Sequence, residues 1–220
     1  MGKSSEANHH PLVFFDLDGT LLDSQSGILY SFRETLRELG RDESDDNLRQ
    51  LIGPPLWESF ARLGVGDDDL DAVVRRYREH YDRRGADMSQ PYEGIRELLE
   101  QLDAEHVTMA VATSKRVDFA LRMLQGHHLD QHFVTICGAS LDNQVTTKID
   151  IVDLALVELG SRSVGAQFMV GDRREDMAAA VQHSLRPVGA LWGYGSVDEL
   201  IGSGAFHVLT EPGELLGLVV

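Results

Sequence analysis

Two carboxylates that directly follow a short apolar run are the residues of this sequence best placed to do chemistry. The run Val13–Phe15 has the composition of a buried strand in a parallel sheet, and Asp16 and Asp18 come after it. Because side chains alternate along a strand, we expect both carboxylates on one face, at the strand end where open α/β folds bind ligands. Carboxylates this close are stable together when they share a cation. The pair therefore predicts a cation site, with a solvated turn as the competing interpretation.

Further polar side chains stand where other β-like runs end or where the next helix begins. These are Thr113, Ser114, Lys148, Asp172 and Asp176. Carboxylates suit a hard cation such as Mg²⁺, which leaves coordination positions free for a substrate phosphate. A hydroxyl, an ammonium group and backbone N–H groups suit the remaining phosphate oxygens. The set predicts a site for phosphate and a divalent cation at one edge of the sheet.

Apolar β-like runs alternate with amphipathic segments through most of the chain. The expected strands are Val13–Phe15, Val107–Ala112, Phe133–Cys137, Phe168–Val170 and Val188–Leu191, with Phe206–Leu209 as a possible sixth. The expected helices are Glu93–Leu102, Val117–Leu124, Ile149–Leu159 and Asp176–Gln182. Such alternation predicts an α/β fold, a Rossmann-like parallel sheet with crossover helices.

The interval between Ser24 and Ser89 contains helical patterns but no convincing strand. We therefore predict an α-helical cap over residues 24–89, inserted into an α/β core formed by residues 11–23 and 90–220. A helical insert directly after the first strand is well placed to act as a lid over Asp16 and Asp18. Residues 1–10 are polar and predict a disordered tail.

The charge balance excludes several classes of partner. The chain has 20 basic and 36 acidic residues, a formal net charge of −16, which argues against nucleic acid and anionic membranes. Apolar runs are too short for a bilayer span, and the first residues lack the order of a signal peptide. The single cysteine, Cys137, cannot form an internal disulfide. These features favour a cytoplasmic location.

Four motifs in order resemble those of the haloacid dehalogenase superfamily, and in particular its phosphoglycolate phosphatase-like branch with a helical cap. Asp16–Thr20 matches the first motif, Thr113 the second and Lys148 the third. The fourth motif is matched by Gly171 and Asp172 together with Asp176. The similarity extends from about residue 12 to residue 200.

The resemblance implies a Mg²⁺-dependent phosphatase that acts on a small phosphorylated metabolite. It implies that Asp16 is the nucleophile that forms an aspartyl-phosphate, and that Asp18 is the general acid and base. Mg²⁺ would be held by Asp16, the Asp18 carbonyl and Asp172, with Asp176 as a ligand through water or as an orienting group. The protein would be a monomer or a homodimer.

The same resemblance implies which groups bind the phosphoryl oxygens. These are the Thr113 hydroxyl, the Gly19 and Ser114 backbone N–H groups and the Lys148 ammonium group. Thr113 and Lys148 thereby count among the catalytic residues. Lys115, just past the second motif, is left open as either a substrate contact or an ion-pair partner.

Three other functions remain compatible with these residues. A 5′-nucleotidase or another phosphatase specificity would use the same machinery. A phosphosugar mutase would share Asp16 and Asp18 but return the phosphoryl group to the sugar. A non-catalytic phosphate-binding protein is disfavoured because it has no need for a nucleophile.

Overall fold

The computed structural model describes residues 10–142, 144–160 and 165–220. The tail expected over residues 1–10 lies, apart from His10, outside the described residues. The chain divides into two compact units. One unit is the continuous segment Leu22–Gln90, and the other is formed by the chain up to Leu21 together with Pro91–Val220.

The larger unit contains a six-stranded sheet whose strand order is β5-β4-β1-β6-β7-β8 and whose paired strands are all parallel. The strands are β1 (Leu12–Phe15), β4 (Thr108–Arg116), β5 (Thr135–Ala139), β6 (Gln167–Gly171), β7 (Arg186–Ala190) and β8 (His207–Leu209). This confirms the predicted α/β class, and each of the six apolar runs contributes a strand. The boundaries differ most at β4, which continues beyond the expected end at Ala112 to Arg116, and at β5 the residues Phe133 and Val134 precede the strand.

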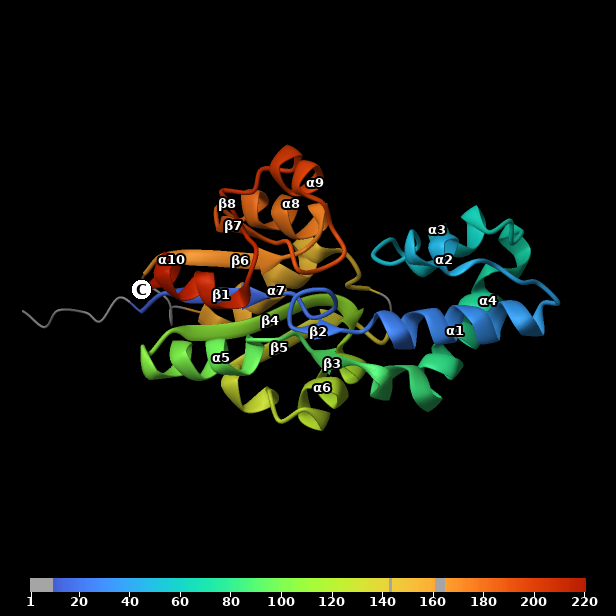
Figure 1. Ribbon diagram of the computed structural model, residues 1–220, viewed down its shortest axis with the longest axis horizontal. Coiled ribbons are helices and arrows are strands. Elements are labelled where there is room, and N and C mark those ends of the chain that lie inside the picture. The colour runs from blue at the N-terminus through green and yellow to red at the C-terminus, as the bar shows by residue number, and fades with distance from the viewer. Residues whose placement is uncertain (1–9, 143, 161–164) are drawn as a thin grey trace, which may run out of the picture. The chain divides into compact units, whose positions relative to one another are not determined.

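Helices cover both faces of this sheet (Figure 1). They are α5 (Ile95–Ala104), α6 (Val117–Gly126), α7 (Lys148–Leu159), α8 (Arg174–Gln182), α9 (Val197–Gly202) and α10 (Leu216–Val219), with 3-10 turns at Asp130–His132 and Pro212–Leu215. Figure 1 shows α5 and α6 on one side of the sheet and α8 and α9 on the other. Crossover connections of this kind join parallel strands and place the carboxyl ends of the strands at one common edge of the sheet.

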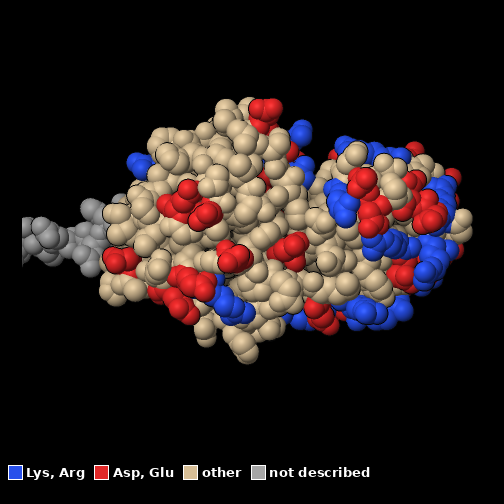
Figure 2. Space-filling model, viewed as in Figure 1, with Lys and Arg blue, Asp and Glu red and all other residues tan. Residues whose placement is uncertain are grey.

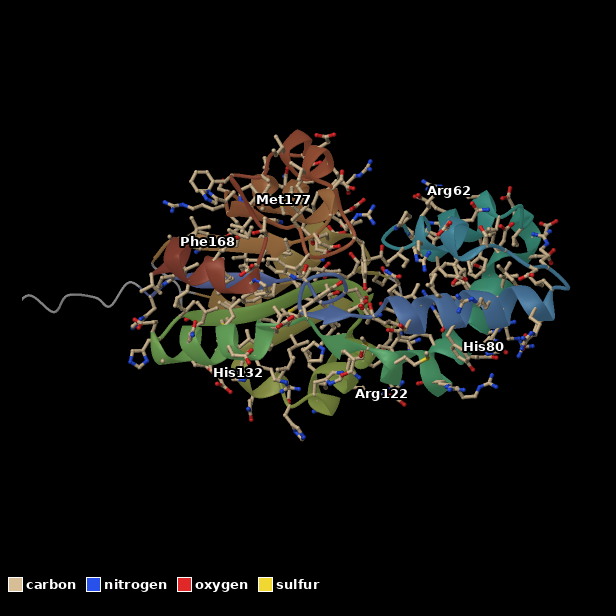
Figure 3. The ribbon with its side chains drawn as sticks, viewed as in Figure 1. Arg62, His80, Arg122, His132, Phe168 and Met177 are labelled. Carbon is tan, nitrogen blue, oxygen red and sulfur yellow. The ribbon has the colours of Figure 1, made fainter. Side chains whose placement is uncertain are left out.

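The core forms around β1, whose four residues are all buried. Leu12 and Phe14 belong to one buried cluster with residues of α7 and α8, while the Phe15 ring contacts Phe133 on the other face. Figure 3 shows Phe168 on β6 and Met177 on α8, and both are buried as well. Burial on both faces explains why β1 is a continuous apolar run rather than an alternating pattern.

The Leu22–Gln90 unit is helical, as its sequence pattern indicates. It contains α1 (Gln25–Glu38), α2 (Asp45–Arg49), α3 (Leu56–Arg62), α4 (Asp67–His80), a π-helical turn at Tyr81–Gly85 and a 3-10 turn at Ala86–Met88. A two-stranded ladder of β2 (Leu22–Asp23) and β3 (Gln90–Pro91) stands where this segment begins and ends. These strands were not anticipated because two residues are too few to show a periodic pattern.

Aromatic rings form the centre of this helical unit. The Phe32 ring contacts the rings of Phe60 and Tyr77 at centroid distances of 5.2 and 4.8 Å. His80, labelled with Arg62 in Figure 3, is buried, and its Nε2 lies 3.1 Å from a Glu38 carboxylate oxygen. Figure 2 shows basic and acidic side chains interleaved on the face of this unit that is in view. In the part of the chain that the structure describes, we find no helix with the length and apolarity needed to cross a membrane.

A pair of glycine substitutions tests the close packing between α1 and the π-helical turn. A Cβ atom added at Gly27 would lie 1.9 Å from the Gly85 carbonyl oxygen, whereas one added at Gly126 would meet nothing within 4 Å. Alanine is the better helix former by about 1 kcal/mol, but overpacking of this kind costs about 1–3 kcal/mol. We expect Gly27→Ala to lower the urea midpoint measured by circular dichroism, while Gly126→Ala leaves it unchanged or raises it. Equal midpoints for the two variants would contradict the contact.

Candidate functional site

Asp16 directly follows β1, the strand that lies between β4 and β6 in the sheet. Its backbone N–H donates to the Val170 carbonyl at 2.9 Å, which continues the ladder to β6, and the residue is buried. The strand itself ends at Phe15, and Asp18 stands beyond it as an isolated β-bridge residue at the start of a turn. The turn forms because the Leu17 carbonyl accepts from the N–H groups of Thr20 and Leu21.

Gly19 makes this turn possible. Its φ of +84° lies in the left-handed region, and a Cβ atom there would stand 2.2 Å from Asp172 Oδ2. Thr20, the next residue, is buried and donates through Oγ1 to Asp172 Oδ1 at 3.4 Å. The turn after β1 and the loop after β6 are therefore packed against each other.

Lys148 connects the elements of the site through one buried ammonium group. It is the first residue of α7, and Nζ lies 2.7 Å from Asp16 Oδ1 and 2.8 Å from Asp176 Oδ1. Nζ also donates to the Ala112 carbonyl of β4 at 3.1 Å. The ammonium group therefore forms ion pairs with two carboxylates and a hydrogen bond with a backbone carbonyl.

Asp172 and Asp176 are both fully buried, one after β6 and the other in the first turn of α8. Asp176 Oδ2 accepts from the Arg173 backbone N–H at 3.0 Å, which caps the helix while Oδ1 faces Lys148. Asp172 Oδ2 accepts from the Tyr194 backbone N–H at 2.8 Å. Gly171 gives Asp176 its space, because a Cβ atom there would lie 2.1 Å from Asp176 Cγ.

The buried carboxylates of this site carry more negative charge than the single ammonium group of Lys148 can balance. Burial, followed by the Asp176 and Asp16 carboxylates, raises the pKa of Asp172 well above its ordinary range. Burial likewise raises the pKa of Asp176 to about 7, although Lys148 opposes the shift. Burial alone would lower the pKa of Lys148, but Asp16 and Asp176 outweigh it and raise that pKa. One lysine does not compensate three buried carboxylates, so the site favours a further cation.

The geometry fits a divalent metal ion. Asp16, Asp172 and Asp176 each offer a carboxylate oxygen, and these oxygens lie within 4.8 Å of one another. An all-oxygen donor set of buried carboxylates suits Mg²⁺ or a similarly hard cation. The Asp18 side chain is not part of this group.

The last part of β4 carries three further polar residues of the site, Thr113, Ser114 and Lys115. Thr113 is buried and its Oγ1 accepts from the Lys115 backbone N–H at 3.2 Å, while Ser114 is exposed. The Lys115 ammonium group lies 2.8 Å from Asp18 Oδ2, so of the two roles left open for Lys115 the geometry shows the ion pair.

Residues 192–195 belong to the site although sequence reasoning gave them no role. Trp192 Nε1 donates to the Thr20 carbonyl at 2.9 Å, and the Tyr194 backbone N–H holds Asp172. A Cβ atom at Gly193 would lie 2.2 Å from the Gly19 carbonyl oxygen, and one at Gly195 would lie 1.9 Å from the Asp172 carbonyl oxygen. The signal available in the sequence was the pair of glycines flanking Tyr194 after an apolar run, which is typical of close backbone approach.

The raised pKa of Asp176 gives a pH dependence whose sign can be measured. The folded state binds this proton more tightly than the unfolded chain, in which the Asp176 pKa has its ordinary value of 3.8. The contribution of this group to the free energy of unfolding is therefore complete below about pH 4 and is lost as the pH rises to about 7. Asparagine does not titrate. Without divalent cations, we expect Asp176→Asn to gain in free energy of unfolding relative to the unmodified protein across this window, measured by urea unfolding at several pH values.

Asp45→Asn serves as the control for this experiment. A side-chain hydrogen bond from Arg33 lowers the Asp45 pKa below 3.8, so its effect on stability belongs to more acidic solutions. The Asp45→Asn difference should therefore stay flat across the window. A flat difference for Asp176→Asn as well would contradict the raised pKa.

Comparison with known proteins gives consistent matches over nearly the whole chain. A family model described as haloacid dehalogenase-like hydrolase matches residues 13–190. The tyrosine-protein kinase PtkA of Mycobacterium tuberculosis is 40% identical over 197 residues, which are 89% of this chain and 67% of that protein. A 5′-nucleotidase of Pseudomonas aeruginosa is 37% identical over 88% of each chain.

Two further matches bear on branch and fold. A phosphoglycolate phosphatase of Agrobacterium fabrum is 30% identical over 85% of this chain and 83% of that protein. The solved structure of a haloacid dehalogenase-like family protein from Streptococcus pneumoniae superimposes with a TM-score of 0.88 at 29% identity, covering 96% of this chain and 98% of that one.

Proposed function

Because the chain belongs to the haloacid dehalogenase-like hydrolases, we propose that it is a Mg²⁺-dependent phosphatase that hydrolyses small phosphomonoesters through an aspartyl-phosphate. The observation that carries this proposal is the Lys148 ammonium group bound to both Asp16 and Asp176 at the carboxyl edge of the sheet, with Asp172 beside them. In this proposal, the edge combines a carboxylate nucleophile, a fixed positive charge and a donor set for a hard cation.

In the first half of the reaction, the Asp16 carboxylate attacks phosphorus and the bond to the leaving oxygen breaks. Asp18 donates its proton to that oxygen, so the alcohol departs neutral. In the second half, Asp18 takes a proton from a water molecule, which attacks phosphorus and releases Asp16 and inorganic phosphate. Covalent catalysis of this kind divides one difficult displacement into two easier ones.

The charge on the phosphoryl oxygens is balanced by groups that the fold holds rigid. We assign Lys148 and the Thr113 hydroxyl to these oxygens, together with the backbone N–H groups of Gly19 and Ser114. Lys148 and Thr113 are both buried, so their donors need little reorganisation when charge develops.

Mg²⁺ would be held by Asp16, Asp172 and the Asp18 carbonyl, while Asp176 orients Lys148. When bound, the ion supplies positive charge that neutralises the carboxylates and polarises the phosphoryl group. The raised pKa of Asp172 supports this assignment, because burial among carboxylates leaves the charge of this group uncompensated.

The names of the relatives support a phosphate ester of a small metabolite as substrate. Relatives carry the names 5′-nucleotidase and phosphoglycolate phosphatase. These agree in the reaction and differ in the leaving group. We propose phosphoglycolate and nucleoside monophosphates as the first substrates to test.

The similarity to PtkA favours a second candidate, transfer of a phosphoryl group to tyrosine. An aspartyl-phosphate on Asp16 could pass its phosphoryl group to a phenol in place of water, with a nucleoside triphosphate as donor. Incubation with labelled ATP and a tyrosine peptide separates the two: labelled peptide supports transfer, and release of free phosphate alone supports the phosphatase.

Asp16→Asn tests the nucleophile. An amide cannot form the aspartyl-phosphate, so we expect turnover of every ester that the unmodified protein hydrolyses to fall by about a thousandfold or more in a phosphate-release assay with Mg²⁺. Asp153→Asn, which makes the same charge change at an exposed position of α7, should retain full activity. If Asp16→Asn matched Asp153→Asn, the proposed function would be wrong.

Removal of the metal tests the cation site. We expect chelation of divalent cations to stop turnover and added Mg²⁺ to restore it. Asp172→Asn should require a higher Mg²⁺ concentration for half-maximal activity, because one anionic ligand is lost. Calorimetric titration with Mg²⁺ gives the same comparison without turnover. Full activity in excess chelator would contradict the metal requirement.

A further inference from the structure

Lys115 is a partly buried cation of the site, and the proposed reaction gives it no role. It follows Ser114 at the end of β4, and its side chain is only 9% exposed. Its Nζ lies 2.8 Å from Asp18 Oδ2, and its backbone N–H donates to Thr113 Oγ1 at 3.2 Å. The side chain of Lys115 therefore contacts Asp18 and its backbone contacts Thr113, and the proposed reaction uses both of these residues.

The two carboxylate oxygens of Asp18 lie in different surroundings. Oδ2 is engaged by Lys115. Oδ1 is buried and has no hydrogen-bond partner among the residues that the structure describes. A buried acceptor without a partner is unfavourable, and such atoms in native proteins call for a functional explanation.

We propose that Lys115 is a positioning residue that binds Asp18 Oδ2 and thereby makes Oδ1 the oxygen that exchanges protons with the substrate. An ammonium group has three donors and no acceptor, so an oxygen that faces it must act as an acceptor. The proton that Asp18 carries then resides on Oδ1. This assignment rests on the proposed phosphatase function and adds the atom and the group that orients it.

The assignment completes the proton balance of the reaction. As the bond between Asp16 and phosphorus forms, the bond from phosphorus to the ester oxygen breaks, and the proton on Asp18 Oδ1 moves to that oxygen. In the second half, a proton from water moves to Oδ1 as the water oxygen binds phosphorus and Asp16 leaves. Lys115 keeps its protons throughout.

Loss of Lys115 would free the Asp18 carboxyl group to rotate, so that either oxygen could carry the proton. The effect must then depend on the leaving group. A nitrophenolate leaves readily as an anion, whereas an alkoxide needs its proton during bond cleavage. A general structural defect, or the loss of a substrate contact, would not lower the activity on an alkyl ester more than the activity on an aryl ester.

The test compares Lys115→Met with the unmodified protein on p-nitrophenyl phosphate and on glycerol 1-phosphate, with Mg²⁺ present. We expect kcat/KM on the alkyl ester to fall by about tenfold to a hundredfold, and on the aryl ester by less than about threefold. Lys115→Arg retains a cationic donor and should recover part of the loss. Arg96→Met, which removes a charge from an exposed position of α5, should change neither value.

The outcomes separate the inference from the function beneath it. Equal losses of Lys115→Met on both esters would overturn the positioning role, and so would a change confined to KM. If Lys115→Met does not give a cooperative thermal transition, Lys115→Gln provides the same comparison with a neutral side chain. An unmodified protein that hydrolyses neither ester, nor any phosphomonoester tested, would overturn the phosphatase function itself and the role of Lys115 with it.

Discussion

The site depends on the burial of three carboxylates around one ammonium group. Asp16, Asp172 and Asp176 come from two strand ends and one helix start, and Lys148 bonds to two of them. In a medium of low dielectric, this excess of negative charge is unfavourable, as the raised pKa values of Asp172 and Asp176 show. The same excess is what binds a cation. Local destabilisation and function therefore have one physical cause.

Such a cluster requires a rigid frame. Backbone N–H groups of Arg173 and Tyr194 hold Asp176 and Asp172, while Trp192 anchors the turn after β1. Close backbone contacts hold these segments together, and a side chain at Gly193 would clash with the Gly19 carbonyl. Because the donors that hold the carboxylates are mostly backbone groups, their directions are fixed by the fold before any ligand binds.

The sheet and the edge cluster were predictable because their signals are local. Apolar runs such as Val13–Phe15 mark buried strands, and polar residues that directly follow parallel strands must meet at one edge. The turn that places Asp18 was missed because it depends on hydrogen bonds to the Leu17 carbonyl and on the space beside Gly19. Trp192 contacts Thr20 across most of the chain length, and no local pattern reports such a contact. Sequence periodicity predicts elements, whereas hydrogen-bond partners follow from their assembly.

The choice of lysine at two positions of this site has a geometric reason. The chain has 20 basic residues, and only Lys3, Lys115 and Lys148 are lysines. The protons of an ammonium group diverge, so Lys148 can reach Asp16, Asp176 and the Ala112 carbonyl at once. A planar guanidinium group directs its donors within one plane. Lys115 likewise delivers a compact charge to one oxygen of Asp18, and no donor among the described residues reaches the other oxygen.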